Sequence, residues 1–183
     1  MNLLSVSLAF LLIFFVDKSL AQNEFVPGYI INSKHDTLFG EMRLNLKNEA
    51  ECFSKISFKE KTNGSIKTYQ PHRIDGFGIE GNHYHSVKLD NHWVFMLVHC
   101  QGKIGLFEYK PPAFSGNEKL KSDYYVMKGG FENLQELAID NKLKKHIKAL
   151  VSDDKPLWKD FEKNEFNFGV LVNLISEYND RNK

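Results

Sequence analysis

Short segments in which apolar and polar residues alternate run from Phe25 to about Lys128, and polar turn residues separate them. Two of these segments, 29–31 and 37–42, lie on either side of the polar run 33–36, which predicts a hairpin. A third, Cys52–Lys59, leads into Asn63-Gly64, the dipeptide that best accepts the positive φ of a two-residue hairpin turn. The pattern therefore predicts an antiparallel sheet built from consecutive hairpins.

One of the downstream segments differs from the others, because Trp93–Val98 is apolar at every position. A strand of this kind is covered on both faces, so we expect a second sheet or the C-terminal helices to pack over it. The remaining predicted strands are Ser65–Gln70, Ile74–Glu80, His83–Leu89, Ile104–Lys110 and Asp123–Lys128.

The apolar period changes after Gly129-Gly130. Residues 131–137 fit either a helical turn or a returning strand. Beyond them, an apolar stripe at helical spacing begins at residue 142, Asp154 is placed to cap a second helix, and a third is expected at 168–178.

Strands that precede helices in the chain are typical of the α+β class. We predict an antiparallel, strongly bent β-sheet or partial barrel followed by two or three C-terminal helices, the helical part covering about 142–180. Residues 22–183 are long enough for a single domain with its own core.

The N-terminus predicts a cleavable signal peptide over residues 1–21. Its apolar run, Leu3–Val16, is shorter than the roughly 20 residues that cross a bilayer as a helix. Ser19 and Ala21 supply the small residues that signal peptidase requires. The alternative is a retained anchor, since no basic residue precedes the run. No later segment approaches a membrane span, so the mature chain is predicted to have none.

Composition and charge exclude some functions. The formal net charge is +1, with acidic and basic residues mixed along the chain, which argues against a nucleic-acid partner. In an oxidising compartment Cys52 and Cys100 can form a disulfide, and the alternative is two buried thiols. The spacing of the two cysteines does not decide between a disulfide and two thiols.

Gly76–Gly81 fits the pattern G-x-G-x-x-G letter for letter. A dinucleotide site needs a helix to begin at the last glycines, because the phosphate binds at that N-terminus. The residues that follow, 82–87, have the pattern of a strand. We therefore interpret the glycines as part of a strand and a tight turn, and we predict no cofactor.

His83 and His85 place two imidazoles on one face of a strand, a spacing that metal sites on sheets use. A two-residue turn at 90–91 puts His92 opposite Leu89 and roughly 20 Å along the sheet from His83, too far to share an ion. His35, His72 or His99 could supply a third ligand. The pair is thus the metal candidate, and the alternative is partly buried polar residues on a sheet surface.

No catalytic residue is predicted. His99 and Cys100 are neighbours on a strand, so alternation directs them to opposite faces and argues against a Cys–His pair. The chain has no G-x-S-x-G motif for a serine nucleophile. The glutamates and Asp153-Asp154 are expected to be solvated charges.

Three groups of residues, in this order, carry a family resemblance: Pro27-Gly28-Tyr29-Ile30-Ile31 with Asp36-Thr37-Leu38 and Gly40; Tyr69, Pro71, Ile74, Gly76, Phe77 and Ile79 with Tyr84 and Ser86; and Phe166 through Leu171, Leu174 and Ile175 to Tyr178-Asn179. They resemble an uncharacterised family of exported cell-envelope proteins of Bacteroidetes-type bacteria. His35 stands where that family prefers glycine, which implies a left-handed conformation, and Arg73 where an acidic residue is usual. The resemblance implies an envelope location and brings no catalytic residues.

Together these features predict a protein in the periplasm, at the cell surface or outside the cell. The function we expect is a non-catalytic binding or structural module whose partner is an envelope protein or a small ligand. Two alternatives stay open: a metal-dependent hydrolase that uses His83 and His85, and a carrier of a small apolar molecule.

Overall fold

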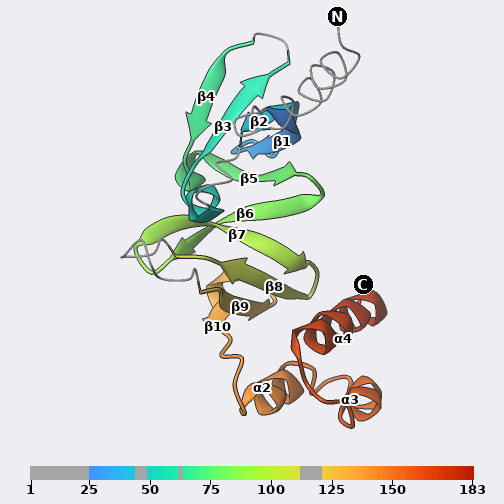
Figure 1. Cartoon of the computed structure of the whole chain (residues 1–183). Helices are drawn as coiled ribbons and strands as arrows, with labels where there is room; N and C mark the ends of the chain where they lie inside the picture. The colour runs from blue at the N-terminus through green and yellow to red at the C-terminus, as the bar shows by residue number, and fades with distance from the viewer. Residues whose placement is uncertain (1–24, 44–48, 62–63, 112–120) are drawn as a thin grey trace, which may run out of the picture.

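A computed structural model describes residues 25–43, 49–61, 64–111 and 121–183. In these residues a ten-stranded antiparallel sheet is followed by three α-helices (Figure 1). The α+β class and the order of strands before helices are confirmed. The predicted signal peptide, residues 1–21, lies outside the described residues.

The sheet is open, with β4 and β10 as its edge strands. Most neighbours in the sheet are also neighbours in the chain; the exception is β5, which pairs with β1. The strand order is β10-β9-β8-β7-β6-β5-β1-β2-β3-β4. The strands are β1 (Val26–Asn32), β2 (Thr37–Arg43), β3 (Ile56–Glu60), β4 (Ile66–Tyr69), β5 (Ile74–Ile79), β6 (Asn82–Leu89), β7 (His92–Cys100), β8 (Ile104–Tyr109), β9 (Asp123–Lys128) and β10 (Gln135–Glu136).

The predicted hairpin turns are present where the described residues include them. Between β1 and β2, the Asn32 side chain accepts hydrogen bonds from two backbone N–H groups of the turn, and His35 has the left-handed φ of 64° that was expected. The turn at 90–91 pairs Leu89 with His92, which confirms the expected register. Asn63 lies outside the described residues, but Gly64 has φ 65° and β3 pairs with β4.

The expectation of a strand beginning at Cys52 is wrong. Cys52 lies in a short 3-10 helix, η2 (Glu49–Phe53), and β3 begins only at Ile56. The helical turn is closed locally, because the Glu51 carbonyl accepts hydrogen bonds from the backbone N–H groups of Ser54 and Lys55. The alternating pattern was therefore overridden by local hydrogen bonding.

The two faces of the sheet have different cores. One, which we call the helix face, carries Leu106 and Val126 in a cluster with all three helices. The other, which we call the histidine face, carries His83 and His85, and a cluster around Met96 and Phe107. Successive residues of a strand alternate between these faces.

The apolar strand β7 is covered on both faces in its middle, as predicted, since Val94, Phe95 and Met96 are buried. The cover combines one of the expected elements, a C-terminal helix, with the unexpected 3-10 helix η2. Phe95 packs in a cluster with Phe53 of η2, and α4 touches β7 as well as β8. Trp93, at the start of the strand, is 47% exposed.

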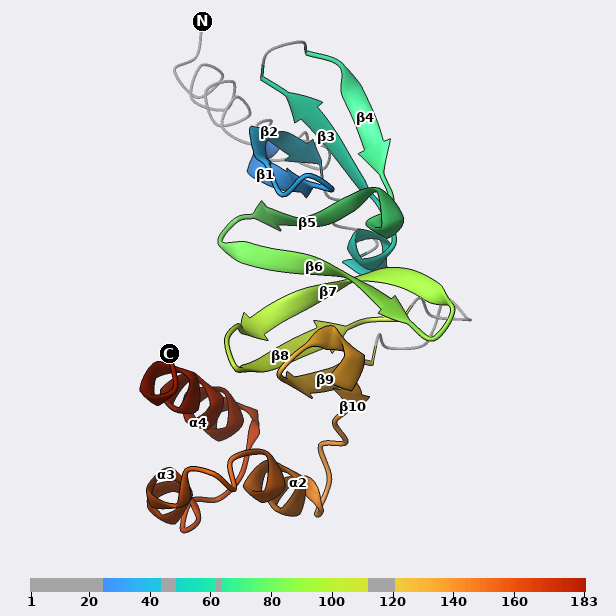
Figure 2. The same cartoon turned by 180° about the vertical axis from the view of Figure 1, so that it is seen from behind.

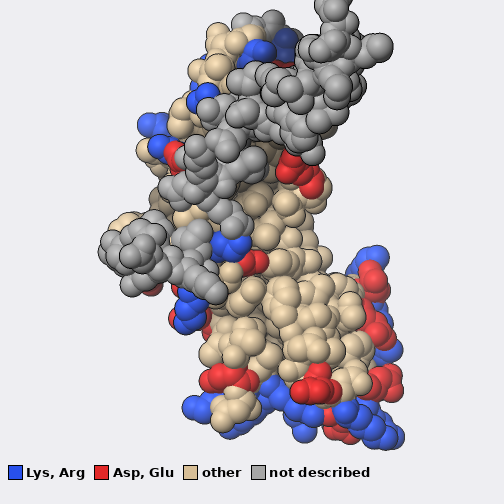
Figure 3. All heavy atoms as spheres, in the orientation of Figure 1, with Lys and Arg blue, Asp and Glu red and all other residues tan. Residues whose placement is uncertain are grey.

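Three α-helices complete the described chain: α2 (Leu143–Leu150), α3 (Lys155–Phe161) and α4 (Phe168–Arg181). The Asp154 side chain accepts a hydrogen bond from Leu157 N, which confirms the predicted cap. Residues 131–137 combine both alternatives, a 3-10 turn η4 (Phe131–Asn133) and then β10. The helices lie beyond the β7–β10 end of the sheet (Figures 1 and 2), and charged side chains gather over them (Figure 3).

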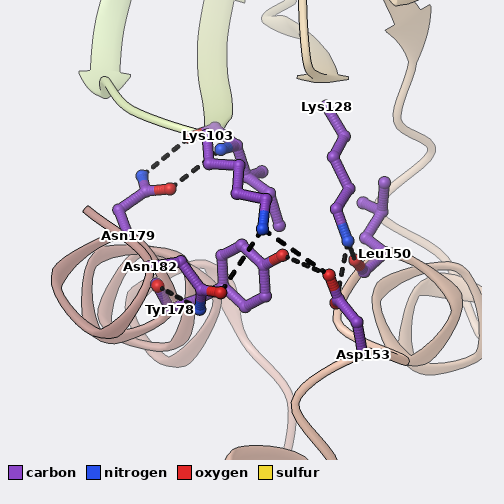
Figure 4. A network of polar contacts seen from close by, with 8 residues as sticks. Lys103, Lys128, Leu150, Asp153, Tyr178, Asn179 and Asn182 are labelled. Atoms are coloured by element: carbon purple, nitrogen blue, oxygen red, sulfur yellow. Dashed lines mark hydrogen bonds and ion pairs between the residues drawn. The ribbon is translucent and has the colours of Figure 1, made fainter.

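Helix α4 is fixed to the sheet by a paired amide and a charged network (Figure 4). The Asn179 side chain accepts from Ile104 N at 2.8 Å and donates to Ile104 O at 2.7 Å. Lys128 Nζ donates to Asp153 Oδ1 at 2.8 Å, and the Tyr178 hydroxyl donates to Asp153 Oδ2 at 2.8 Å. In the described part of the chain no helix has the length and apolar character to cross a bilayer.

Candidate functional site

The candidate site is a row of rings on the histidine face. Cross-strand pairing places Phe39 of β2 opposite Tyr29 of β1, Tyr29 opposite Gly78 of β5, and Gly78 opposite His83 of β6. His85 lies two residues further along β6, on the same face as His83. Phe131 of η4 continues the row beyond His85. We call these five side chains, Phe39, Tyr29, His83, His85 and Phe131, the aromatic–histidine stripe.

Each ring of the stripe contacts the next. The ring centroids are 6.0 Å apart for Phe39 and Tyr29, 6.0 Å for Tyr29 and His83, and 4.8 Å for His83 and His85. His85 and Phe131 are 5.8 Å apart, and both rings pack on the buried Phe107. The Tyr29 hydroxyl and His83 Nδ1 share a hydrogen bond of 3.0 Å. These contacts hold the central rings in fixed orientations.

Gly78 explains how Tyr29 reaches a histidine two strands away. A Cβ at Gly78 would lie 2.2 Å from the Tyr29 ring, so the ring occupies the space that any other side chain would fill. The glycine-rich segment 76–81 thus forms strand β5 and a turn with φ 49° at Glu80 and 80° at Gly81, and another strand follows. The interpretation of a strand and a tight turn is confirmed.

The two imidazoles favour their neutral forms. Burial lowers the pKa of His83, the neighbouring His85 lowers it further, and a hydrogen bond with the backbone of Phe77 opposes both effects. Burial also lowers the pKa of His85, against the opposing influence of Asp75. The centre of the stripe is therefore uncharged at neutral pH.

The structure brings His35 near this site but does not complete a metal centre. His35 Nδ1 lies 2.7 Å from Asp75 Oδ2; the contact is electrostatic, since that oxygen accepts no well-aligned hydrogen bond among the described residues. Within the described ranges, no three histidine, cysteine or acidic side chains are grouped to hold an ion. His83 and His85 stay adjacent imidazoles whose partners are a phenol, rings and one nearby carboxylate.

On the helix face, His99 forms a polar cluster that the sequence did not predict. Its Nε2 lies 2.8 Å from Glu108 Oε2, and the Ser122 hydroxyl donates to Glu108 Oε1 at 2.5 Å. These bonds, led by that from His99, lower the pKa of Glu108 to about 2. Glu108 is only 8% exposed, so the expectation that the glutamates are solvated is wrong for this one.

The expectation that His99 and Cys100 face opposite sides is also wrong. The register between β7 and β8 shifts between Val98 and Cys100, which marks a β-bulge at His99. A bulge sets two residues against one on the partner strand, so alternation is lost there. Both side chains consequently meet α4: His99 packs on Phe168, and the Cys100 thiol lies 3.5 Å from the Ser176 hydroxyl.

The alternative of two buried thiols agrees with the structure, since no disulfide joins Cys52 and Cys100. Cys52 lies in η2, whereas Cys100 ends β7 under α4. Burial raises the pKa of the Cys100 thiol, which disfavours the nucleophilic thiolate. Cys100 is therefore a core residue and not an activated nucleophile.

No family model, curated protein or solved structure matches this chain. Its function must be argued from the geometry of the site.

Two cavities lie beside the helices and differ from the stripe in character. One, of about 310 Å³, has Cys100, Lys103 and Asn179 in its wall; the other, of about 270 Å³, lies between β9, β10 and α2. Lys103 and Asn179 already bond to other parts of the chain. The stripe instead presents ring surface to solvent, with Phe39 64% and Phe131 41% exposed.

Proposed function

We propose that this chain is an exported cell-envelope protein that acts as a non-catalytic binding module through the aromatic–histidine stripe. The observation that carries the proposal is the row of touching rings with large exposed ends at Phe39 and Phe131. Contiguous exposed ring surface on a folded protein is typical of a contact site. Tyr29 and the imidazoles add polar groups that can orient a bound molecule.

Binding fits the stripe better than hydrolysis does. A general base must be paired with a nucleophile or a metal-bound water. The side-chain hydrogen-bond partner of His83 is a phenol that lies against a glycine of β5, and His85 packs against two phenylalanine rings. Such partners hold the rings in fixed orientations, which serves a recognition surface.

Export and envelope location belong to the same proposal. They are supported by the apolar run before Ser19-Leu20-Ala21 and by the resemblance to exported proteins. N-terminal sequencing of the protein purified from its native envelope is expected to begin at Gln22. A product that begins at Met1 and fractionates with cytosolic proteins would refute the location.

The proposed form of the binding face is a strongly bent sheet, approaching a partial barrel. Figures 1 and 2 support this, because β3 and β4 run steeply across the direction of β6 and β7. Strong twist of this kind curves a sheet and gives its faces different shapes. Small-angle scattering of residues 22–183 is expected to fit the curved sheet better than a flat one of equal strand number.

The binding proposal is tested with immobilised protein of residues 22–183 and solubilised native envelope. The test variant is Phe39→Ala with Phe131→Ala, and the control is Trp93→Ala. Trp93 is an aromatic residue of similar exposure, 47%, and strand alternation places it on the opposite face from Val94 and Met96. Mass spectrometry is expected to find one molecule retained by the native protein and the control and lost with the test variant. Equal retention by all three would refute the stripe as the binding surface.

A further inference from the structure

We infer that the ligand of the aromatic–histidine stripe is an uncharged glycan chain that lies across the strands. The inference rests on the proposed function, because it names the class of molecule that the same stripe binds. Four features of the histidine face carry it: two charged pairs that flank the stripe, apolar rings at its ends with polar groups between them, a ring that covers the glycine of β5, and length.

Two pairs of oppositely charged side chains flank the stripe. Lys59 Nζ donates to Glu41 Oε2 at 3.0 Å, and these residues lie directly opposite each other on β3 and β2. His35 lies against Asp75 on the other side of the stripe. A charged ligand that used these groups would have to break one of the pairs, whereas a neutral ligand leaves both intact.

The side chains of the stripe match the two kinds of surface on a sugar ring. A pyranose has apolar C–H faces and a rim of hydroxyl groups. The exposed rings of Phe39 and Phe131 offer apolar planes for the faces. Between them, the Tyr29 hydroxyl and the imidazole nitrogens can donate to or accept from hydroxyls, and rings of this kind lose little entropy on binding.

The ring of Tyr29 fills space that a glycine of β5 would leave open. Gly78 has no side chain at the crossing between β1 and β6, and the Tyr29 ring lies over it. Left-handed polyproline peptides bind in grooves between aromatic side chains. At Gly78 the Tyr29 ring fills the place of such a groove, which favours a sugar chain packed on exposed rings over such a peptide.

The stripe is long enough for several sugars. From β2, which carries Phe39, to β8, whose Phe107 lies beneath Phe131, the sheet order has five strand spacings. At about 4.8 Å each, these give roughly 24 Å. A single sugar would cover only part of this length, so the chemistry favours an oligomer.

The ligand should bind less well in acid. The titratable groups that face His83 and His85 are Tyr29 from β1 and Asp75 from β5, with His35 of the β1–β2 turn beyond it. A single carboxylate, already in contact with His35, cannot balance two protonated imidazoles. Covering them with a neutral sugar would then cost desolvation of positive charge.

The test uses NMR of ring-labelled protein, residues 22–183, with three classes of probe at millimolar concentration. Neutral hexasaccharides of glucose, mannose, xylose, galactose and N-acetylglucosamine form the first set, hexagalacturonate is the anionic probe, and decaproline is the peptide probe. We expect at least one neutral sugar to shift the His83 and His85 ring signals at pH 7.5, with affinity falling at least threefold at pH 5. Phe39→Ala with Phe131→Ala should weaken binding at least tenfold, and Trp93→Ala should leave it unchanged.

The outcomes separate the ligand class from the proposed function. If no neutral sugar shifts these signals, or if affinity rises in acid, the glycan inference is overturned. Should decaproline or hexagalacturonate shift them instead, the stripe remains a binding surface with a different ligand. If a neutral sugar binds but Phe39→Ala with Phe131→Ala changes nothing, both the inference and the stripe as the site are refuted.

Discussion

The histidines on the two faces of the sheet have contrasting surroundings. On the helix face, His99 has a carboxylate at 2.8 Å, and packing by Tyr124 and Phe168 surrounds it. On the histidine face, His83 has a phenol and a second imidazole as neighbours, and burial lowers its pKa. The first arrangement keeps the Glu108 carboxylate ionised through hydrogen bonds between β7, β8 and Ser122. The second favours uncharged imidazoles within a row of rings, which suits a surface that binds neutral molecules.

The comparison depends first on α4 covering the helix face, and Asn179→Ala tests that cover. Loss of the Asn179 amide leaves the buried N–H and C=O of Ile104 without their side-chain partner. The free energy of unfolding should therefore fall by about 3 kcal/mol. Urea denaturation measures this. Asn182→Ala is the control, because its bonds to Tyr178 O and Lys103 are more exposed, and it should cost less than about 1 kcal/mol. Equal costs would contradict the role given to Asn179.

On the histidine face, the matching test is Gly78→Ala. The new methyl group would lie 2.2 Å from the Tyr29 ring and must displace it, at a cost of about 2 kcal/mol. The His83 ring signals should shift as the 3.0 Å hydrogen bond breaks.

Tyr29→Ala supplies the control for that substitution, because it removes the clashing ring. Adding Gly78→Ala to it should cost less than about 0.5 kcal/mol, which a double-mutant cycle measures. A cost of 2 kcal/mol in both backgrounds would mean that the backbone, and not Tyr29, makes the glycine necessary.

Glu108→Gln asks whether the helix face depends on its charge. The substitution keeps the shape but weakens the bonds to His99 and Ser122, so we expect a loss of about 1–2 kcal/mol at pH 7. Glu177→Gln is the control; it removes an exposed pair with Arg181 and should change stability by less than about 0.5 kcal/mol.

Glu108→Gln should also change how the stability of the protein depends on pH. The folded-state pKa of Glu108 is lowered to about 2, so its contribution is full above the unfolded value of 4.5 and is lost as the pH falls toward 2. Glu108→Gln should remove that part of the acid dependence. If the variant loses stability in acid as steeply as the native protein, Glu108 is not the source of that loss.

The sequence predicted those parts of the fold that depend on local chemistry. The Asp154 cap and the pairing of Leu89 with His92 each follow from neighbours a few residues away, whereas the left-handed His35 was expected only from the family resemblance. The polar cluster on the helix face was missed because a bulge shifts His99, and no local pattern marks a bulge. Glu108 did leave a signal, as the single charge in the apolar strand Ile104–Tyr109. Such a charge is rarely buried without a partner.

The candidate site was predicted only in part, for a similar reason. The spacing of His83 and His85 placed both on one face of β6, as the structure has them. Tyr29 reaches them because β5 pairs with β1 and carries a glycine at the crossing, a long-range pairing that the hairpin pattern does not contain. Phe39 and Phe131 join the row through the same sheet order. Short-range alternation therefore defines a face, whereas topology decides which residues share it.

The smallest expected effect concerns the histidine face alone. The pKa values of His83 and His85 are lowered in the folded protein, so below pH 6.5 the unfolded chain takes up protons first and stability falls as the pH falls. Because both rings are only half-buried, we expect about 0.5 kcal/mol between pH 7 and pH 5. His83→Asn with His85→Asn should flatten this slope, while His92→Asn, at an exposed turn, should keep it. A double variant with the native slope would mean that the imidazoles are as well solvated folded as unfolded, and the contrast with His99 and Glu108 would then rest on geometry alone.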